Sequence, residues 1–368
     1  MIQDDTNGPE QPALEPSGSA AKLNIYGLET AELASLPALA GQPSFRPQQV
    51  SHWIYGRGAE KFDEMTDLSK ELRRRLEEAC EIRRVHPVED STSGDESATK
   101  YLFRLEDGRT VEAVWIRDPR RETLCISSQA GCAFGCNFCA TASMKSGRNL
   151  TAGEILSQVA ALREMMARRG AIEVHNIVFM GMGEPLANYE QLVRSLRLLC
   201  GTPGFGLPAK RITVSTVGLE PEIRRLAREP VAVRLAFSLN ATTDEVRSRI
   251  MPVNRKYPFR SVLDALREYQ QLKGEPITLE YVLLSGVNDG PEDAERLARL
   301  ARSLQCKVNL IAYNPHRFAP YAPVADARIG AFRERMLPIA GRVTITVRWS
   351  KGRDIQAACG QLATERSG

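Results

Sequence analysis

Residues 123–139 read TLCISSQAGCAFGCNFC, an apolar run followed by a loop with three cysteines. The run Thr123–Ser127 has the composition of a short buried strand. Cys132, Cys136 and Cys139 follow it with the spacing C-x3-C-x2-C. Strand-like and helix-like stretches then alternate, which is typical of βα units in a parallel sheet, either open or curled into a barrel. The cysteines therefore lie after the first strand of that series, at the end of the sheet where barrels place active sites.

Other elements can be predicted along the chain. The clearest helix begins at Thr151, which can form a capping box with Glu154. Asp107-Gly108 lies between two alternating runs and predicts a β-hairpin, and residues 45–80 have helical periodicity. The remaining predicted strands are Asn176–Gly181, Arg211–Ser215, Val231–Leu239, Ile277–Leu284, Lys307–Tyr313 and Val343–Trp349.

The patterns divide the chain into five segments. These are a disordered tail (1–21), a helical module (22–95), a hairpin extension (96–120), an α/β body (121–350) and a C-terminal segment (351–368). The tail is rich in Pro, Ser, Gly and Ala, a composition typical of flexible chain.

The composition is that of an ordinary globular protein. Of 368 residues, 43% are hydrophobic and 26% are charged, which excludes disordered and collagen-like proteins. The first fifty residues carry two basic and six acidic side chains, a net of −4, so the remainder carries +8. That split weakly favours a polyanionic partner. We expect a cytoplasmic protein, because no apolar run suits a secretory signal or the roughly 18 residues of a membrane span. Eight cysteines in a reducing compartment indicate metal or redox chemistry.

The three clustered cysteines can hold either zinc or an iron–sulfur cluster. A structural zinc ion needs four protein ligands, and the nearest further thiol, Cys125, lies inside a predicted strand. A 4Fe–4S cluster held by three thiolates leaves one iron open to bind a substrate. The spacing therefore favours the cluster over zinc.

A second motif, Met180-Gly-Met-Gly183-Glu184-Pro185, follows the next predicted strand. Its glycines allow the backbone to approach a ligand, and Glu184 can accept a hydrogen bond from an ammonium group. An ordinary βα turn would also explain it. Ser215 and Ser238-Leu239-Asn240 end later strands, where they could contact ribose or carboxylate oxygens or could simply cap helices.

The cysteine spacing followed by this turn resembles the radical S-adenosylmethionine (radical SAM) enzymes. Further segments are similar to the RlmN/Cfr family of RNA adenine methyltransferases: Phe45–Tyr55, Phe62–Asp67, Val111–Ile116, Cys125–Gln129, Asn149–Glu154, Met251–Tyr257 and Ala357–Leu362. The resemblance implies an α/β fold, a partial (β/α)6 radical SAM barrel with a small N-terminal helical RNA-binding domain and a connecting β-hairpin. It implies a 4Fe–4S cluster on Cys132, Cys136 and Cys139, and two S-adenosylmethionine molecules per turnover. The cofactor contacts that it implies are Gly183, Glu184, Ser215, Ser238, Leu239, Asn240 and Asn314.

The resemblance also implies the chemistry. Cys359 would be methylated first, its methyl group would be activated by a radical derived from a second S-adenosylmethionine, and the carbon would add to adenine. Cys125 would release the product by forming a transient disulfide with Cys359. Cys125 could also serve as the base, and Glu112 matches the residue assigned that role in the family. The substrates would be adenine 2503 of 23S rRNA and adenine 37 of some tRNAs, methylated at carbon 2. We expect a flavodoxin-type one-electron reductant, no membrane partner and a monomer.

Two alternatives are methylation at carbon 8 of the same adenine, as in Cfr, and a non-catalytic, zinc-stabilised RNA-binding protein. One position departs from the family pattern, because Asn240 stands where histidine is expected. Three groups of basic side chains could contact RNA phosphates: Arg73–Arg75, then Lys145 and Arg148, and last Arg348, Lys351 and Arg353. Runs such as Arg73–Arg75 are more often solvated helix faces, so the group before Cys359 is the better candidate, because RNA must come to that thiol. Cys80, Cys200 and Cys306 are expected to be structural.

Overall fold

The computed structural model describes residues 22–144, 147–171 and 173–363. The predicted tail, residues 1–21, and Lys145 lie outside the described residues. Within these ranges one ten-stranded sheet organises the chain, in the order β14-β13-β12-β11-β10-β9-β6-β5-β4-β3. The strands from β6 to β14 in that order are all parallel. They are β6 Arg121–Cys125, β9 Asn176–Phe179, β10 Ile212–Thr216, β11 Arg234–Ser238, β12 Thr278–Leu283, β13 Lys307–Ala312 and β14 Ile345–Arg348.

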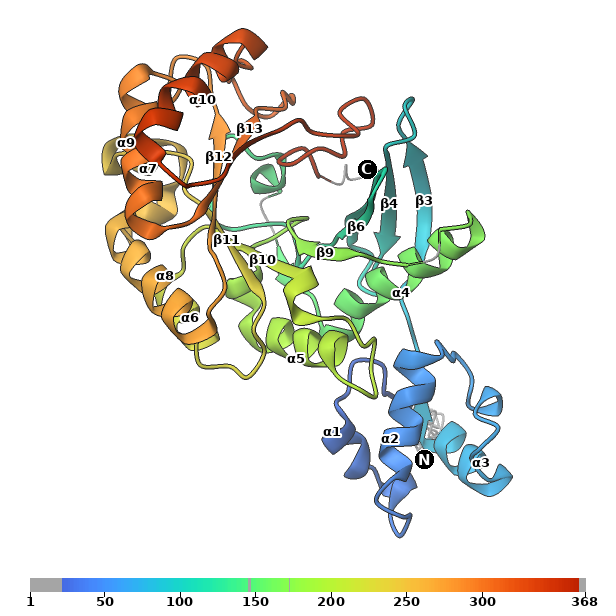
Figure 1. The fold of residues 1–368 in the computed structure, drawn as a ribbon. Coiled ribbons are helices and arrows are strands. Elements are labelled where there is room, and N and C mark those ends of the chain that lie inside the picture. The colour runs from blue at the N-terminus through green and yellow to red at the C-terminus, as the bar shows by residue number, and fades with distance from the viewer. Residues whose placement is uncertain (1–21, 145–146, 172, 364–368) are drawn as a thin grey trace, which may run out of the picture.

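Helices connect each parallel strand to the next and cover the outer side of the curved sheet (Figure 1). They are α4 Ala152–Arg168, α5 Tyr189–Cys200, α6 Glu220–Leu226, α7 Asp244–Ile250, α8 Phe259–Lys273, α9 Pro291–Leu304 and α10 Asp326–Ala340. In the described chain, β14 and β6 do not pair, so the curled sheet stays open between them. This confirms the predicted partial barrel of six βα units. Strand β14 follows the sixth unit and adds one more parallel strand at the edge of the sheet.

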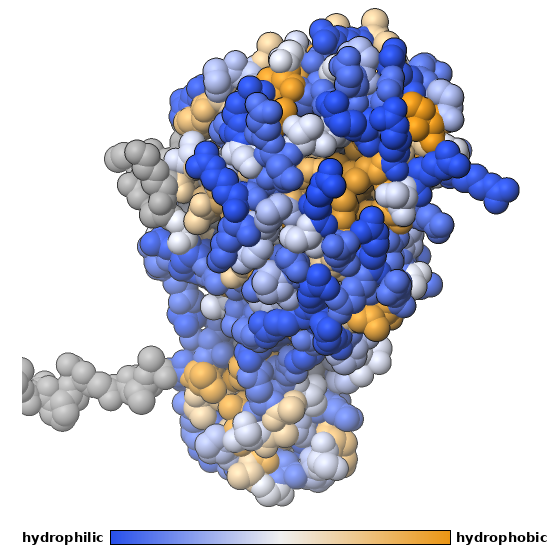
Figure 2. All heavy atoms as spheres, turned by 90° about the vertical axis from the view of Figure 1, so that its left-hand side faces the viewer, coloured by the Kyte–Doolittle hydropathy of each residue, from blue (hydrophilic) through white to orange (hydrophobic). Residues whose placement is uncertain are grey.

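Helix α4 shows why these sequences form helices here. Thr151 Oγ1 accepts a hydrogen bond from the Glu154 amide at 3.2 Å, and the Glu154 carboxylate accepts one from the Thr151 amide at 2.8 Å. The capping box satisfies two amides that would otherwise lack partners. The apolar row that begins at Ile155 is buried against the sheet. The outward surface of the helical layer is mainly hydrophilic, with small apolar patches between charged side chains (Figure 2).

The predicted hairpin is present and extends the barrel sheet. Strands β4 (Ala98–Arg104) and β5 (Thr110–Asp118) flank Gly108, whose φ is +78°. Strand β5 pairs antiparallel with β6, and β3 (Pro87–Thr92) pairs with β4. The antiparallel part therefore begins at Pro87, inside the segment that the sequence assigned to the helical module. Most of β3 is exposed, so its sequence lacks the apolar alternation that indicates a strand.

The N-terminal module lies below the barrel in Figure 1. It contains α1 (Thr30–Ala34), α2 (Arg46–Ser51), α3 (Lys70–Ala79) and the short parallel strands β1 (Leu23–Asn24) and β2 (Cys80–Glu81). Its backbone meets the barrel closely, since a Cβ on Gly27 would lie 2.5 Å from the Gly153 nitrogen at the start of α4. Among the described helices, none has the length and apolar character needed to cross a membrane.

Candidate active site

The three clustered cysteines occupy one loop at the carboxyl end of the sheet. The loop lies between β7 (Gln129–Ala130) and β8 (Arg148–Asn149), which pair antiparallel and hold its two ends together. Burial raises the pKa of Cys132 to about 12. Burial also raises the pKa of Cys136, and the neighbouring thiols Cys139 and Cys132 raise it further. The thiols are therefore close enough to interact electrostatically.

Three thiols suit a 4Fe–4S cluster better than a structural zinc ion, which needs four protein ligands. A 4Fe–4S cluster held by three thiolates leaves one iron open to a ligand. Cys125, the only further thiol near in sequence, lines a different pocket together with Cys359. Cys125 is therefore not placed as a fourth thiolate for zinc.

Glu184 lies beside this loop. Its carboxylate accepts hydrogen bonds from the amides of Leu186 at 3.1 Å and Val217 at 2.8 Å. Burial raises its pKa to about 7, and its charge in turn raises the pKa of Cys132. Gly183 has φ +96°, and a Cβ there would lie 2.5 Å from Gln129 Cβ, so a larger residue would push β7 away. The turn thus presents an acceptor that can still receive a hydrogen bond from a ligand next to the cysteine loop.

The other predicted cofactor contacts end neighbouring strands. Ser215 is half-buried on β10 and pairs with Ala236 of β11, and Ser238 pairs with Glu280 of β12. The carbonyl oxygens of Ser238 and Leu239 accept hydrogen bonds from Arg247, at 3.1 and 2.9 Å. The Arg247 guanidinium therefore holds the backbone in place at the end of β11.

Asn240 stands at the position that departs from the family pattern. It has φ +56°, a left-handed conformation that Asn tolerates better than most residues. Its Oδ1 accepts a hydrogen bond from the Val282 amide at 2.9 Å, and its Nδ2 contacts Met251 Sδ at 3.3 Å. Both ends of the amide have partners inside the protein, so this side chain connects β11 to β12.

Arg247 was not predicted by the sequence reasoning. It is fully buried, and it donates to Asn254 Oδ1 at 2.8 Å and to the Val217 carbonyl at 2.7 Å, besides the strand ends. Burial lowers its pKa to about 10, while the nearby Cys136 thiol raises it. Arg247 therefore places a positive charge under the cysteine loop. Its position on a short amphipathic helix resembles that of any solvated arginine, so the sequence contains no signal for this role.

A second pocket holds the two remaining predicted cysteines. Cys125 at the end of β6 and Cys359 in the C-terminal segment line one cavity of about 210 Å³. Both thiols are free. Burial raises the pKa of Cys125 to about 12, and Cys359 raises it further. The pocket thus brings together two thiols from opposite ends of the barrel sequence.

Asn314 holds Cys359 in this place. Its Nδ2 donates to the Cys359 carbonyl at 3.1 Å and to Ser350 Oγ at 2.9 Å. Its Oδ1 is buried without a partner among the described residues, which leaves an acceptor for a ligand. The segment is also tied to the cysteine loop, because Ala140 donates to the Gly360 carbonyl at 2.7 Å. The two sites are therefore adjacent.

Glu112 lies on the same side of the sheet as Cys125. Val114 of β5 is opposite Cys125 of β6, and Glu112 is two residues from Val114, so the three side chains share a face. Burial raises the pKa of Glu112, although Lys100 forms an ion pair with it at 2.9 Å. Its Oε2 has no partner in the described chain.

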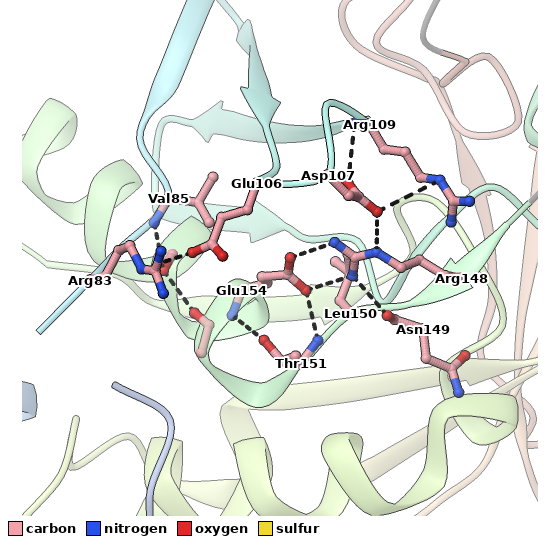
Figure 3. A network of polar contacts seen from close by, with 12 residues as sticks. Arg83, Val85, Glu106, Asp107, Arg109, Arg148, Asn149, Leu150, Thr151 and Glu154 are labelled. Carbon is pink, nitrogen blue, oxygen red and sulfur yellow. Dashed lines mark hydrogen bonds and ion pairs between the residues drawn. The ribbon is translucent and has the colours of Figure 1, made fainter. Parts of the chain in front are cut away.

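Arg148 has a structural role rather than the predicted phosphate contact. It is paired with Asp107 at 2.6 Å and with both oxygens of Glu154 at 2.7 and 2.8 Å (Figure 3). Figure 3 shows the guanidinium between the hairpin turn and the capped start of α4. Arg148 therefore fastens the end of the cysteine loop to two other elements, which uses its hydrogen-bonding capacity within the protein.

Comparison with known proteins agrees with this geometry. Residues 126–301 match the radical SAM superfamily, and residues 23–82 match the ribosomal RNA large subunit methyltransferase N-terminal domain. The chain is 47% identical over 340 residues to the dual-specificity RNA methyltransferase RlmN of Geobacter sulfurreducens, covering 92% of each chain. The chain belongs to the RlmN family. It is also 42% identical to RlmN 2 of Myxococcus xanthus, covering 98% of this chain and 96% of that protein.

A solved structure supports the same assignment. A radical SAM methyltransferase from Sphaerobacter thermophilus superposes with a TM-score of 0.86 at 46% identity, covering 93% of this chain and 100% of that one. Membership of the RlmN family confirms the predicted enzyme class, a radical SAM RNA methyltransferase, and the predicted cofactors, a 4Fe–4S cluster and S-adenosylmethionine.

Proposed function

We propose that this enzyme methylates carbon 2 of an adenine in 23S rRNA and in some tRNAs, with Cys359 as the methyl carrier. The observation that carries the proposal is the cavity shared by Cys125 and Cys359 beside the cysteine loop. Carbon 2 of adenine is not nucleophilic. It therefore cannot attack the electrophilic methyl group of S-adenosylmethionine directly. A thiol carrier divides the difficult transfer into covalent steps.

Cys132, Cys136 and Cys139 would hold the cluster, and Glu184 and Asn314 would bind S-adenosylmethionine. Together these groups supply one-electron chemistry that activates an unreactive methyl group. Support comes from the grouped thiols, from the Glu184 carboxylate beside them and from the unpartnered Oδ1 of Asn314. Asn240 would support the strand ends of this site through Val282 and Met251 instead of contacting the cofactor.

Cys125 would release the product. Its thiolate attacks the Cys359 sulfur, so a sulfur–sulfur bond forms while the bond from that sulfur to the transferred carbon breaks. The carbon keeps the electron pair and takes a proton, which completes the methyl group. The disulfide is afterwards reduced, which suits a reducing compartment.

Glu112 is the candidate base for the adenine proton. Its raised pKa and unpartnered Oε2 fit a buried carboxylate that accepts a proton, and Lys100 holds it in position. The flavodoxin-type reductant and the monomeric state stay predictions.

Replacing Cys125 by Ala tests the proposal. The variant should accumulate RNA linked covalently to Cys359, detected as a slowly migrating band and mapped by peptide mass spectrometry. Cys306→Ala is the matched control, because Cys306 is equally buried but lies outside the pocket. An iron-loaded Cys125→Ala variant that forms no adduct would remove the resolving role. A methyl group located on carbon 8 after RNA digestion would instead favour the Cfr-type reaction.

A further inference from the structure

Arg348 enters the thiol pocket from the far edge of the barrel. It ends β14, the strand at one edge of the parallel sheet, whereas Cys125 ends β6 at the other side of the opening. Arg348 lines the same cavity as Cys125 and Cys359, and its Nη1 lies 3.6 Å from Met180 Sδ, just beyond β9. The side chain therefore reaches from the edge strand β14 to Met180, which follows β9.

No carboxylate of the described residues forms an ion pair with Arg348. Cys359 raises the pKa of Arg348 most, burial lowers it, and Glu280 and then Cys125 raise it by less. Arg348 in turn lowers the pKa of Cys125, against the larger effect of burial. A cation next to a buried thiol favours the thiolate, which is the reactive form.

Glu280 competes for the same guanidinium. Arg348 is opposite Ile311 of β13, which is opposite Val282 of β12, and Glu280 lies two residues before Val282. Glu280 and Arg348 therefore point to the same side of the sheet. Glu280 is buried, its Oε1 accepts from Asn309 Nδ2 at 2.9 Å, and its Oε2 has no partner among the residues described.

We propose that Arg348 stabilises the thiolate of Cys125, in the cavity that Cys359 also lines, in competition with the buried carboxylate of Glu280. Arg348 is thus a positioning residue for the sulfur chemistry, and not the phosphate contact that the sequence indicated. The proposal rests on the proposed function, which assigns reactions to both thiols. The other charged groups at the cavity are Asp118, Arg121 and Lys351, of which Lys351 and Asp118 form an ion pair at 3.7 Å.

The test measures the reactivity of Cys125 without RNA or turnover. Iron-loaded protein is treated anaerobically with iodoacetamide between pH 7 and 10, and the rate at Cys125 is followed by peptide mass spectrometry. We expect Arg348→Gln to react about tenfold more slowly at each pH, since loss of a nearby opposite charge shifts a pKa by about one unit or more. Arg348→Lys should restore most of the rate. Glu280→Gln should react faster than the wild type, because it removes the competing anion.

Two controls separate a local effect from a general one. Arg121→Gln removes an exposed arginine at the same cavity and should leave the rate unchanged. Cys200, whose pKa is raised to about 11 by burial alone, reports the folding of every variant in the same digest.

An unchanged rate in Arg348→Gln, or equal slowing in Arg121→Gln, would overturn the proposal. If Arg348→Gln does not fold, Glu280→Gln decides, since an equal or slower rate there contradicts the competition. The covalent RNA adduct of Cys125→Ala is a separate measurement. Its absence would remove the roles of the cysteines while the alkylation rates would still report on Arg348.

Discussion

The cysteine loop and the thiol pocket are adjacent, but they are built differently. The loop takes its three thiols from residues 132–139 and is closed by the β7–β8 pair. The pocket takes Cys125 from the first parallel strand, Arg348 from the last and Cys359 from the segment beyond it. The cysteine loop depends on local chain geometry, whereas the pocket depends on the curl of the whole sheet, which brings its first and last parallel strands near each other. The two should therefore respond differently to substitution.

The largest difference is expected between cysteine variants of the two regions. Cys136→Ala should lose both iron and RNA methylation, because it removes one of the three proposed cluster ligands. Cys359→Ala should lose RNA methylation completely but keep the iron content and colour of the wild type. Iron analysis and methyl incorporation measure the two properties. Loss of iron in Cys359→Ala would show that the two regions form one cooperative site.

A smaller effect is expected where the segment that carries Cys359 turns. Gly352 has φ +67°, and a Cβ there would lie 2.9 Å from the Cβ atoms of Ala98 and Ala357. Gly352→Ala should therefore displace Cys359 and slow methylation by roughly 10- to 100-fold, as expected for a misplacement of about 1 Å. Gly341→Ala is the matched control, with the same φ of +67° but nothing within 4 Å. Equal methylation rates in the two variants would show that the contacts of a Cβ at position 352 do not displace Cys359.

A several-fold effect of pH is expected at the cysteine loop. Burial raises the pKa of Glu184 to about 7, so the carboxylate is ionised above that pH and protonated below it. Only the ionised form attracts an ammonium group strongly. The affinity of the iron-loaded enzyme for S-adenosylmethionine should rise between pH 6 and 8, and titration calorimetry can measure it. Glu184→Gln should bind more weakly and without this dependence; the same rise in that variant would implicate another group.

The smallest effect is expected at Arg148, which joins the loop to the hairpin and α4 (Figure 3). Arg148→Gln should lower stability by about 1 kcal/mol, because the lost ion pairs are only partly exposed. Thermal unfolding should shift by a few degrees, and iron should be lost faster on dilution. Arg74→Gln, which removes solvent-exposed ion pairs on α3, should change neither property. Unchanged iron retention in Arg148→Gln would mean that the cysteine loop keeps its conformation without the ion pairs to Asp107 and Glu154.

Much of the fold could be predicted from the sequence. The alternation of strands and helices, the capping box of Thr151 and Glu154 and the turn at Gly108 all depend on neighbouring residues. Strand β3 was placed in the helical module because its exposed residues carry no alternation. Nothing in the sequence indicated the role of Arg247, and Asn240 was assigned to the cofactor instead of to the protein interior. The reason is related, since burial in a polar network leaves no periodic pattern in the sequence.

The sequence by itself determined the cysteine loop, because three cysteines spaced for one turn need only local chain geometry to form a site. It also determined the βα order and, through resemblance, the cofactors and the roles proposed for Cys125 and Cys359. The tertiary structure decided which charges meet these residues. Arg148 pairs with carboxylates, while Arg348 lines one cavity with two thiols. Both are arginines near a functional segment, and only strand register and the curl of the sheet set their different surroundings.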